Sequence, residues 1–244
     1  MSRRERILRT AGILGCQLFA VITFVQLLSG QQNERLLLAA GTVFLVLAPM
    51  VAERLLHCKI STPFYLFCLF YAIGPMLGHC HNLYYLVPWW DKMLHIFGGV
   101  VFAVLGLYVF ERFVGARQKQ MVFCVVFALC FSMAVSVIWE FAEFAADRFF
   151  SLDMQSDTVV NGILSYSLGE GHGNAGTIDN ITDVVINGQK LPFAGYLDIG
   201  LIDTMLDMLL ETLGALAACG FYIIDNGKHP VLIPMNCGRQ RSKE

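Results

Sequence analysis

The sequence predicts an all-α integral membrane protein, a bundle of about six transmembrane helices. The chain has 244 residues, of which 56% are hydrophobic and only 15% are charged. Six stretches reach the roughly 20 predominantly apolar residues that a helix needs to cross a bilayer. The mean hydropathy of +0.60 agrees with this class. The formal net charge of −2 comes with no basic domain, so we expect no nucleic-acid partner.

The six predicted spans cover residues 10–29, 35–53, 62–79, 91–113, 121–149 and 199–224. The first follows four arginines, as a signal peptide would, but it lacks a clear small-residue cleavage site. We therefore expect it to be retained as a helix. In the third span, Pro75 predicts a kink, because proline removes a backbone donor and crowds the preceding turn.

The distribution of basic residues predicts that both termini are cytoplasmic. With six spans and the N-terminus inside, thirteen of the 17 Lys and Arg residues fall on the cytoplasmic side. Such an excess is the usual mark of cytoplasmic loops. The C-terminal end of the chain is also basic, which agrees with an even number of spans.

One long connection, residues 150–198, is predicted to lie on the outer side between the fifth and sixth spans. We treat residues 1–244 as a single transmembrane domain with this loop attached. A glycine-rich run surrounds His172, and Asn187-Gly188 after an apolar run predicts a short hairpin. Loops of this length are often functional. The loop is therefore either a lid that contacts a substrate, with His172 able to reach the site, or a packed cap without chemistry.

Seven ionisable side chains lie near the outer ends of the last three predicted spans, at helical spacing. They are Asp91 and His95, then Glu140, Glu143 and Asp147, then Asp203 and Asp207. Spacings of i,i+3, i,i+4 and i,i+7 place each group on one helix face. At about 1.5 Å of rise per residue, the three groups lie at matching depths on the same membrane side. Ionisable groups at such positions are costly and usually functional.

The charge of this cluster predicts a bound cation or shared protons. Six carboxylates face only two nearby fixed cations, Lys92 and Arg148, which leaves four negative charges uncompensated. We expect all seven residues to be ligands of a divalent metal ion, Mg, Mn or Zn. A di-iron site is disfavoured, because the Glu-x-x-His motifs of such bundles are missing.

Two other interpretations of the cluster stay open. Without a metal, His95, Asp91 and Glu143 are the expected catalytic acid–base groups. Alternatively, the polar residues only hold three helices together. Glu211 continues the face of Asp203 and Asp207 inward, and it is either a supporting group or uninvolved.

The motifs around these residues resemble a known family. Asp91-Lys92-Met93-Leu94-His95, Trp139-Glu140-Phe141-Ala142-Glu143 and Asp203-Thr204-Met205-Leu206-Asp207 are similar to the YjdF-like family of uncharacterised bacterial inner-membrane proteins. A more distant resemblance is to the VanZ-like membrane proteins, although Glu211 stands where that family usually has Asn. These resemblances imply a multi-pass protein of the bacterial cytoplasmic membrane with an outward-facing site. They imply no particular reaction.

Three functions are compatible with these observations. The first is a metal-dependent hydrolase or transferase that acts on a lipid or a lipid-linked envelope substrate, with membrane lipids as its surroundings and water as the nucleophile. The second is a transporter of cations or protons, although no matching acidic relay leads towards the cytoplasm. The third is a protein that binds an envelope component without turnover.

Overall fold

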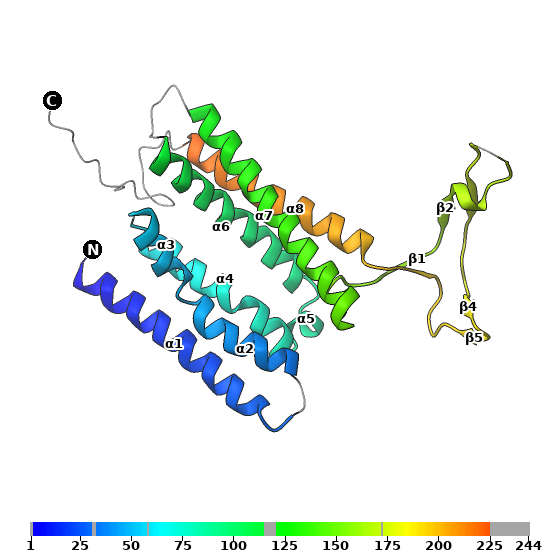
Figure 1. Cartoon of the computed structure of the whole chain (residues 1–244), viewed down its shortest axis with the longest axis horizontal. Coiled ribbons are helices and arrows are strands. Elements are labelled where there is room, and N and C mark those ends of the chain that lie inside the picture. Colours follow the sequence, from blue (N-terminus) through cyan, green and yellow to red (C-terminus); the bar gives the residue numbers. More distant parts are fainter. Residues whose placement is uncertain (1, 31–32, 58, 115–120, 172, 225–244) are drawn as a thin grey trace. The chain divides into compact units, whose positions relative to one another are not determined.

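The computed structural model confirms the six predicted spans (Figure 1). It describes residues 2–30, 33–57, 59–114, 121–171 and 173–224. Within them, six segments are long and apolar enough to cross a membrane: α1 (Arg3–Leu27), α2 with α3 (Asn33–Leu45 and Ala48–Leu56), α4 (Thr62–Cys80), α6 (Trp90–Phe113), α7 (Met121–Phe150) and α8 (Leu201–Ile224). A short helix, α5 (Leu83–Leu86), connects α4 to α6.

Local chemistry sets the ends of several helices. At α1, the Ser2 hydroxyl accepts from the Glu5 N–H at 3.2 Å and the Ser2 N–H donates to Glu5 Oε2 at 2.6 Å, a reciprocal cap. The second span is interrupted between α2 and α3, where Pro49 is in the first turn of α3. Proline suits a first turn because its missing N–H would have no partner there. Pro75 lies inside α4, which continues through it.

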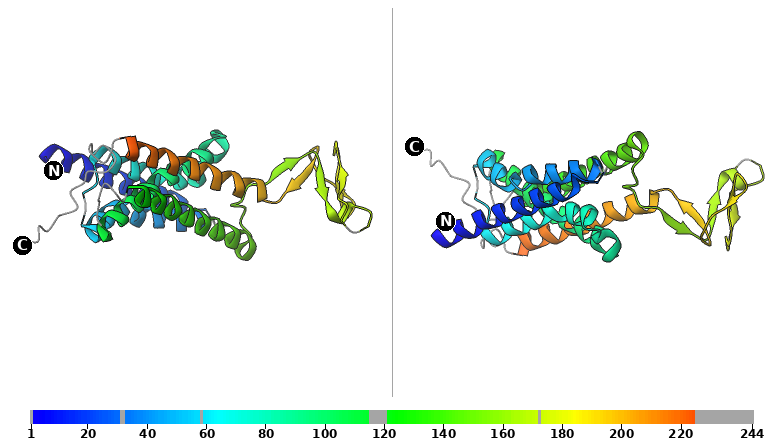
Figure 2. Two further views of the ribbon diagram at one scale, coloured as in Figure 1. Left: turned by 90° about the horizontal axis from the view of Figure 1, so that it is seen from above. Right: turned by 90° about the horizontal axis from the view of Figure 1, so that it is seen from below.

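The chain divides into two compact units, and each is described by itself. Unit 1 comprises Met1–Ser136 and Leu209–Glu244, and unit 2 comprises Val137–Met208. Helices α7 and α8 each contribute to both. In unit 1, α1, α2 and α4 pack against one another (Figure 2).

Close contact between α6 and α8 is the main packing feature of unit 1 for the site. A Cβ atom built on Gly99 of α6 would lie 1.9 Å from the backbone oxygen of Glu211. One built on Gly214 of α8 would lie 2.1 Å from the backbone oxygen of Ile96. Both positions therefore require glycine, and small residues of this kind let membrane helices approach closely. The contact fixes which residues of the two helices face each other.

Arg9 holds the other end of unit 1 together. Its side chain is buried and donates from Nη1 to Glu53 Oε1 at 2.8 Å and from Nε to Thr62 Oγ1 at 3.1 Å. It also donates to the Ile60 carbonyl and lies over the Tyr65 ring, 4.7 Å from its centroid. One guanidinium thus connects α1 with α3 and the start of α4, because its fan of donors satisfies several acceptors at once.

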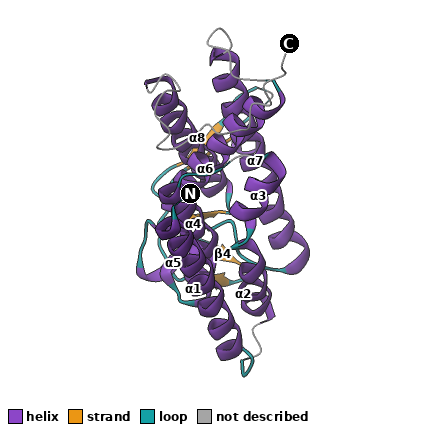
Figure 3. Ribbon diagram, turned by 90° about the vertical axis from the view of Figure 1, so that its left-hand side faces the viewer, coloured by secondary structure: helices purple, strands orange, loops and turns teal. Residues whose placement is uncertain are grey.

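The long loop of unit 2 contains three antiparallel strand pairs. Strands are coloured orange in Figure 3. Strand β1 (Thr158–Val160) pairs with β6 (Tyr196–Asp198), and β2 (Ile163–Ser165) pairs with β3 (Gly176–Ile178). At the predicted hairpin, β4 (Val185–Ile186) pairs with β5 (Gln189–Lys190) around Asn187 and Gly188, whose φ values are 52° and 81°. Positive φ at both turn residues is what a two-residue hairpin turn requires. The first two pairs were not predicted from the sequence.

Candidate functional site

The outer end of α6 carries the first part of the site, in unit 1. Asp91 is in the first turn of the helix and His95 is one turn further along. Asp91 Oδ1 lies 3.7 Å from His95 Nε2, and Asp91 Oδ2 lies 3.1 Å from Lys92 Nζ. The His95 side chain is only 8% exposed, whereas Asp91 is 30% exposed. The i,i+4 spacing therefore places the His95 imidazole beside the Asp91 carboxylate, with the imidazole more deeply buried.

Helix α8 brings a second carboxylate to the other side of the imidazole. Glu211 Oε2 lies 3.9 Å from His95 Nδ1, and its side chain is 5% exposed. A Cβ atom on Gly98 would lie 2.9 Å from the Tyr71 hydroxyl and 3.4 Å from Glu211 Oε1, so a larger residue would have to displace these side-chain ends. The backbone contact between Gly99 and Glu211 sets the position of Glu211 along the helix axis, so that its side chain lies beside His95. We name Asp91, His95 and Glu211 the α6–α8 triad.

The chemistry of the triad follows from the two distances. Both exceed an ordinary hydrogen bond of about 2.7 to 3.2 Å. Two ligand atoms that each lie about 2.1 Å from one ion can be at most about 4.2 Å apart. The 3.7 Å between Asp91 Oδ1 and His95 Nε2 thus fits a shared cation. It also fits an acid–base pair that shortens when a proton is shared.

Two of the predicted site residues in unit 2 hold backbone groups of the loop. Asp147, near the end of α7, accepts from the Met154 N–H at 2.6 Å and the Gln155 N–H at 2.9 Å. Asp203, in the first turn of α8, accepts from the Ser156 N–H at 2.9 Å. Both carboxylates therefore fasten the start of the loop to the helices. Both oxygens of Asp147 are used in this way, and the predicted role of Asp147 and Asp203 as metal ligands stays a prediction.

The remaining predicted site residues in unit 2 are buried. Glu140 is 4% exposed, Glu143 8% and Asp207 1%. Glu143 Oε1 accepts from the Trp139 indole N–H at 2.8 Å, one turn back on α7. Burying a carboxylate is costly unless it is paired or hydrogen-bonded. Their predicted role as metal ligands stays a prediction, as does the catalytic role of Glu143.

The segment just after α7 concentrates negative charge outside the spans. The pKa of Asp157 is raised, first by partial burial and then by the neighbouring carboxylates of Asp153, Asp147 and Asp198. Asp198 in turn accepts from the Ile202 N–H at 2.7 Å and caps α8. The loop between α7 and α8 is thus an acidic region.

A polar contact near the other end of the same helices was missed from the sequence. Glu111 of α6 is buried, and its Oε1 accepts from the Tyr222 hydroxyl of α8 at 2.9 Å. The Cys124 Sγ of α7 lies 4.0 Å from the same hydroxyl. Glu111 stands beside Arg112 in the last turn of α6, a position typical of an interfacial charge. The sequence signal for this contact is an acidic residue inside the last turn of an apolar helix.

Two other histidines near the outer side have structural contacts. His81 Nε2 lies 3.0 Å from the Thr23 hydroxyl, and its ring stacks on Phe19. The His79 ring packs edge-on against Tyr84. These contacts give both rings a packing role. His172, which was expected to reach the site from the loop, lies outside the described residues.

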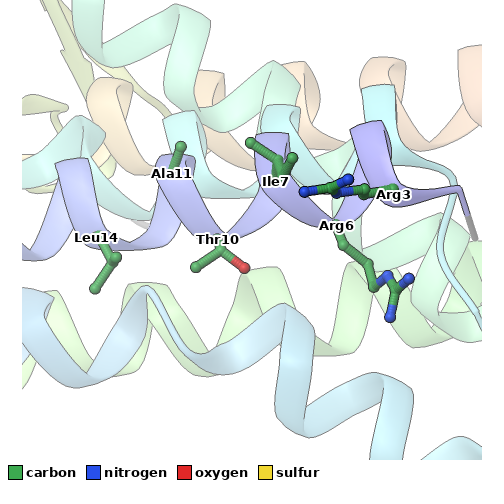
Figure 4. Close-up of a pocket in the computed structure, with 6 residues that line it drawn as sticks. All are labelled: Arg3, Arg6, Ile7, Thr10, Ala11 and Leu14. Carbon is green, nitrogen blue, oxygen red and sulfur yellow. The ribbon is translucent and has the colours of Figure 1, made fainter.

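A surface pocket lies along α1 (Figure 4). It is lined by Arg3, Arg6, Ile7, Thr10, Ala11 and Leu14. Ile7 and Leu14 are more than half exposed, as expected for a helix face that meets lipid. The lining contains no carboxylate and no histidine, so the pocket offers none of the chemistry of the predicted site.

Comparison with known proteins gives one match. Residues 12–227 match the model of a family described as "Predicted membrane protein (DUF2238)". No curated protein matches the chain. No solved structure matches it either.

Proposed function

The chain belongs to this family of predicted membrane proteins, and we propose that it is a metal-dependent hydrolase or transferase. Its substrate would be a lipid or a lipid-linked envelope component. The reaction would take place at the outer leaflet of the bacterial cytoplasmic membrane. This location rests on the basic-residue distribution and on the resemblance to YjdF-like and VanZ-like proteins.

The observation that carries the proposal is the α6–α8 triad. One imidazole has a carboxylate near each ring nitrogen, Asp91 at Nε2 and Glu211 at Nδ1. Histidines that bind metals usually donate their other N–H to a carboxylate, which fixes the tautomer and the ring orientation. Asp91 Oδ1 and His95 Nε2 are then the proposed ligands, and Glu211 would orient the imidazole once its 3.9 Å separation from Nδ1 shortens to a hydrogen bond. A divalent ion at this position would polarise a phosphoryl or acyl oxygen and lower the pKa of a bound water.

Two features around the triad support a phosphorylated or acylated lipid as substrate. Asp91 and Lys92 are each 30% exposed, whereas His95 is buried, so the triad has one accessible side. Lys92 is a cation next to the proposed ligands and suits an anionic headgroup. The position at the outer end of a membrane-spanning helix is where such a headgroup lies.

A transporter is less well supported by the packing of unit 1. Between His95 and Glu111, α6 presents Ala103, Val104 and Leu107, which are at most 1% exposed. On α8, Ala215 and Ala218 belong to the same apolar core. A cation or proton would have to cross this packed layer, in which these five apolar side chains offer nothing to replace water. The layer favours a reaction or binding at one side of the membrane.

The proposal is tested by comparing the envelope lipids of cells that carry the native protein, His95→Ala or Glu34→Gln. Glu34 is an acidic residue at the start of α2, and its variant is the matched control. We expect one lipid pool to change when the native protein or Glu34→Gln is present and not with His95→Ala. An identical lipid profile for native and His95→Ala cells would contradict an enzymatic role. If the purified native protein still bound metal, a binding protein without turnover would then be favoured.

A further inference from the structure

The three strand pairs of the outer loop have unpaired edges. Within the described part of the loop, every sheet has two strands, so each strand has a neighbour on one side only. Two-stranded sheets are marginally stable in water, and an open edge presents a row of backbone donors and acceptors. In the β2–β3 sheet, Leu164 pairs with Thr177 and Ser165 with Gly176. The opposite edges of these two strands are available to another strand.

The same sheet exposes large apolar side chains. Leu164 is 71% exposed and Tyr166, directly after β2, is 73% exposed. Ile178, at the end of β3, is 46% exposed but pairs with Ile163, so it lies on the opposite face from Leu164. Leu164 and Tyr166 are close together in the sequence, and exposed apolar side chains that lie near one another are typical of interaction sites.

The sign of the charge on the loop identifies the kind of partner. Residues 151–200 hold six acidic side chains and one lysine. The lysine, Lys190, already has Asp183 at 3.9 Å. An anionic membrane surface attracts basic segments, so it would repel this loop. A second copy of the chain would bring the same negative charge, whereas a cationic partner is complementary.

We propose that the β2–β3 sheet is a docking site for an extended cationic segment of a partner protein. The segment adds a strand to the open edge, so backbone hydrogen bonds supply affinity. Alternate apolar side chains of the segment pack on Leu164 and Tyr166. The basic ones face Glu170 and Asp179, the acidic residues that follow Tyr166–Leu168 and β3. This role is separate from the chemistry of the α6–α8 triad.

The test uses the full-length protein in nanodiscs of zwitterionic phosphatidylcholine. The probe is a fluorescent heptapeptide of alternating lysine and valine, and anisotropy reports its binding. We expect saturable binding that weakens with salt. Glu170→Gln and Asp179→Asn should each weaken binding by about 1.5-fold to 5-fold, the range for exposed ion pairs. Glu34→Gln removes the same charge outside the loop and should change nothing.

Two further arms separate strand addition from simple charge attraction. A peptide with the same charge but with proline in place of the central valine lacks one backbone donor. It should bind at least tenfold more weakly, and Leu164→Ser should weaken the unmodified peptide. Equal binding of both peptides would overturn the proposal. So would the absence of any binding, or stronger binding of the protein to anionic vesicles than to the peptide.

Discussion

The close contact between α6 and α8 predicts that replacing Gly99 or Gly214 lowers the stability of the protein, whereas replacing Gly220 does not. In Gly214→Ala, the new Cβ would lie 2.1 Å from the Ile96 oxygen, where ordinary contact begins at 3.4 Å. The helices would have to separate by about 1.3 Å at this point. Overpacking of this kind costs about 1 to 3 kcal/mol, and a rigid backbone oxygen favours the upper end. The better helix propensity of alanine returns about 1 kcal/mol, so we expect a net loss of about 2 kcal/mol.

Gly220→Ala is the matched control on the same helix. No heavy atom lies within 4 Å of a Cβ built there, so only the helix propensity should act, and the variant should be slightly more stable. Thermal unfolding in detergent, followed by tryptophan fluorescence, measures both. With about 2 to 4 °C per kcal/mol, Gly214→Ala should lower Tm by about 4 to 8 °C. A Gly214→Ala variant as stable as Gly220→Ala would refute the close contact that positions Glu211 beside His95.

Three further predictions concern contacts outside the triad. Arg9→Ala leaves the Glu53 carboxylate, only 20% exposed, without its cation, and should cost about 3 kcal/mol in thermal unfolding. Tyr222→Phe removes the donor to Glu111 and should cost about 1 to 2 kcal/mol in the same measurement. Because the pKa of Asp157 is raised in the folded chain, its charge is destabilising above that pKa and harmless below the ordinary value of 3.8. Asp157→Asn should therefore increase the protection of loop amides from hydrogen exchange at pH 7, and the gain should shrink as the pH falls towards 3.8.

Each of these has a control on an exposed residue of the same type. They are Arg6→Ala, Tyr85→Phe and Asp179→Asn. In thermal unfolding (the first two) or hydrogen exchange (the third), each should match the native protein. An Arg9→Ala variant no less stable than Arg6→Ala would argue against the buried network at α1. If Tyr222→Phe and Tyr85→Phe unfolded at the same temperature, this would argue against a stabilising hydrogen bond from Tyr222 to Glu111. If the extra protection of loop amides in Asp157→Asn became larger at lower pH, the pKa of Asp157 could not be raised in the folded chain.

The features that the sequence predicted correctly are local. The six spans follow from their length and hydropathy alone, and so does the all-α class. Asp91 and His95 are one turn apart, so their proximity needs no knowledge of any other helix. Asn187 and Gly188 likewise favour the positive φ values of a hairpin turn by themselves.

The features that it missed depend on residues far apart in the chain. Glu211 meets His95 only because Gly99 and Gly214 set the register of two helices, which neither helix specifies alone. The Arg9–Glu53 pair joins two different spans, and a run of arginines looked like an ordinary cytoplasmic start. The role of Asp147 was also hidden, because a carboxylate that accepts two loop N–H groups has the same spacing as one that binds metal.

The most direct test of the proposed site is a titration of the purified protein with Mn²⁺ and Zn²⁺ by calorimetry in detergent. We expect the native protein and Glu34→Gln to bind one of these ions. Glu211→Gln should bind about 10-fold to 100-fold more weakly, the usual effect of losing the carboxylate that orients a metal-bound histidine. His95→Ala should not bind at the same site. Equal metal binding by the native protein and His95→Ala, or none by either, would contradict a metal site built on Asp91, His95 and Glu211.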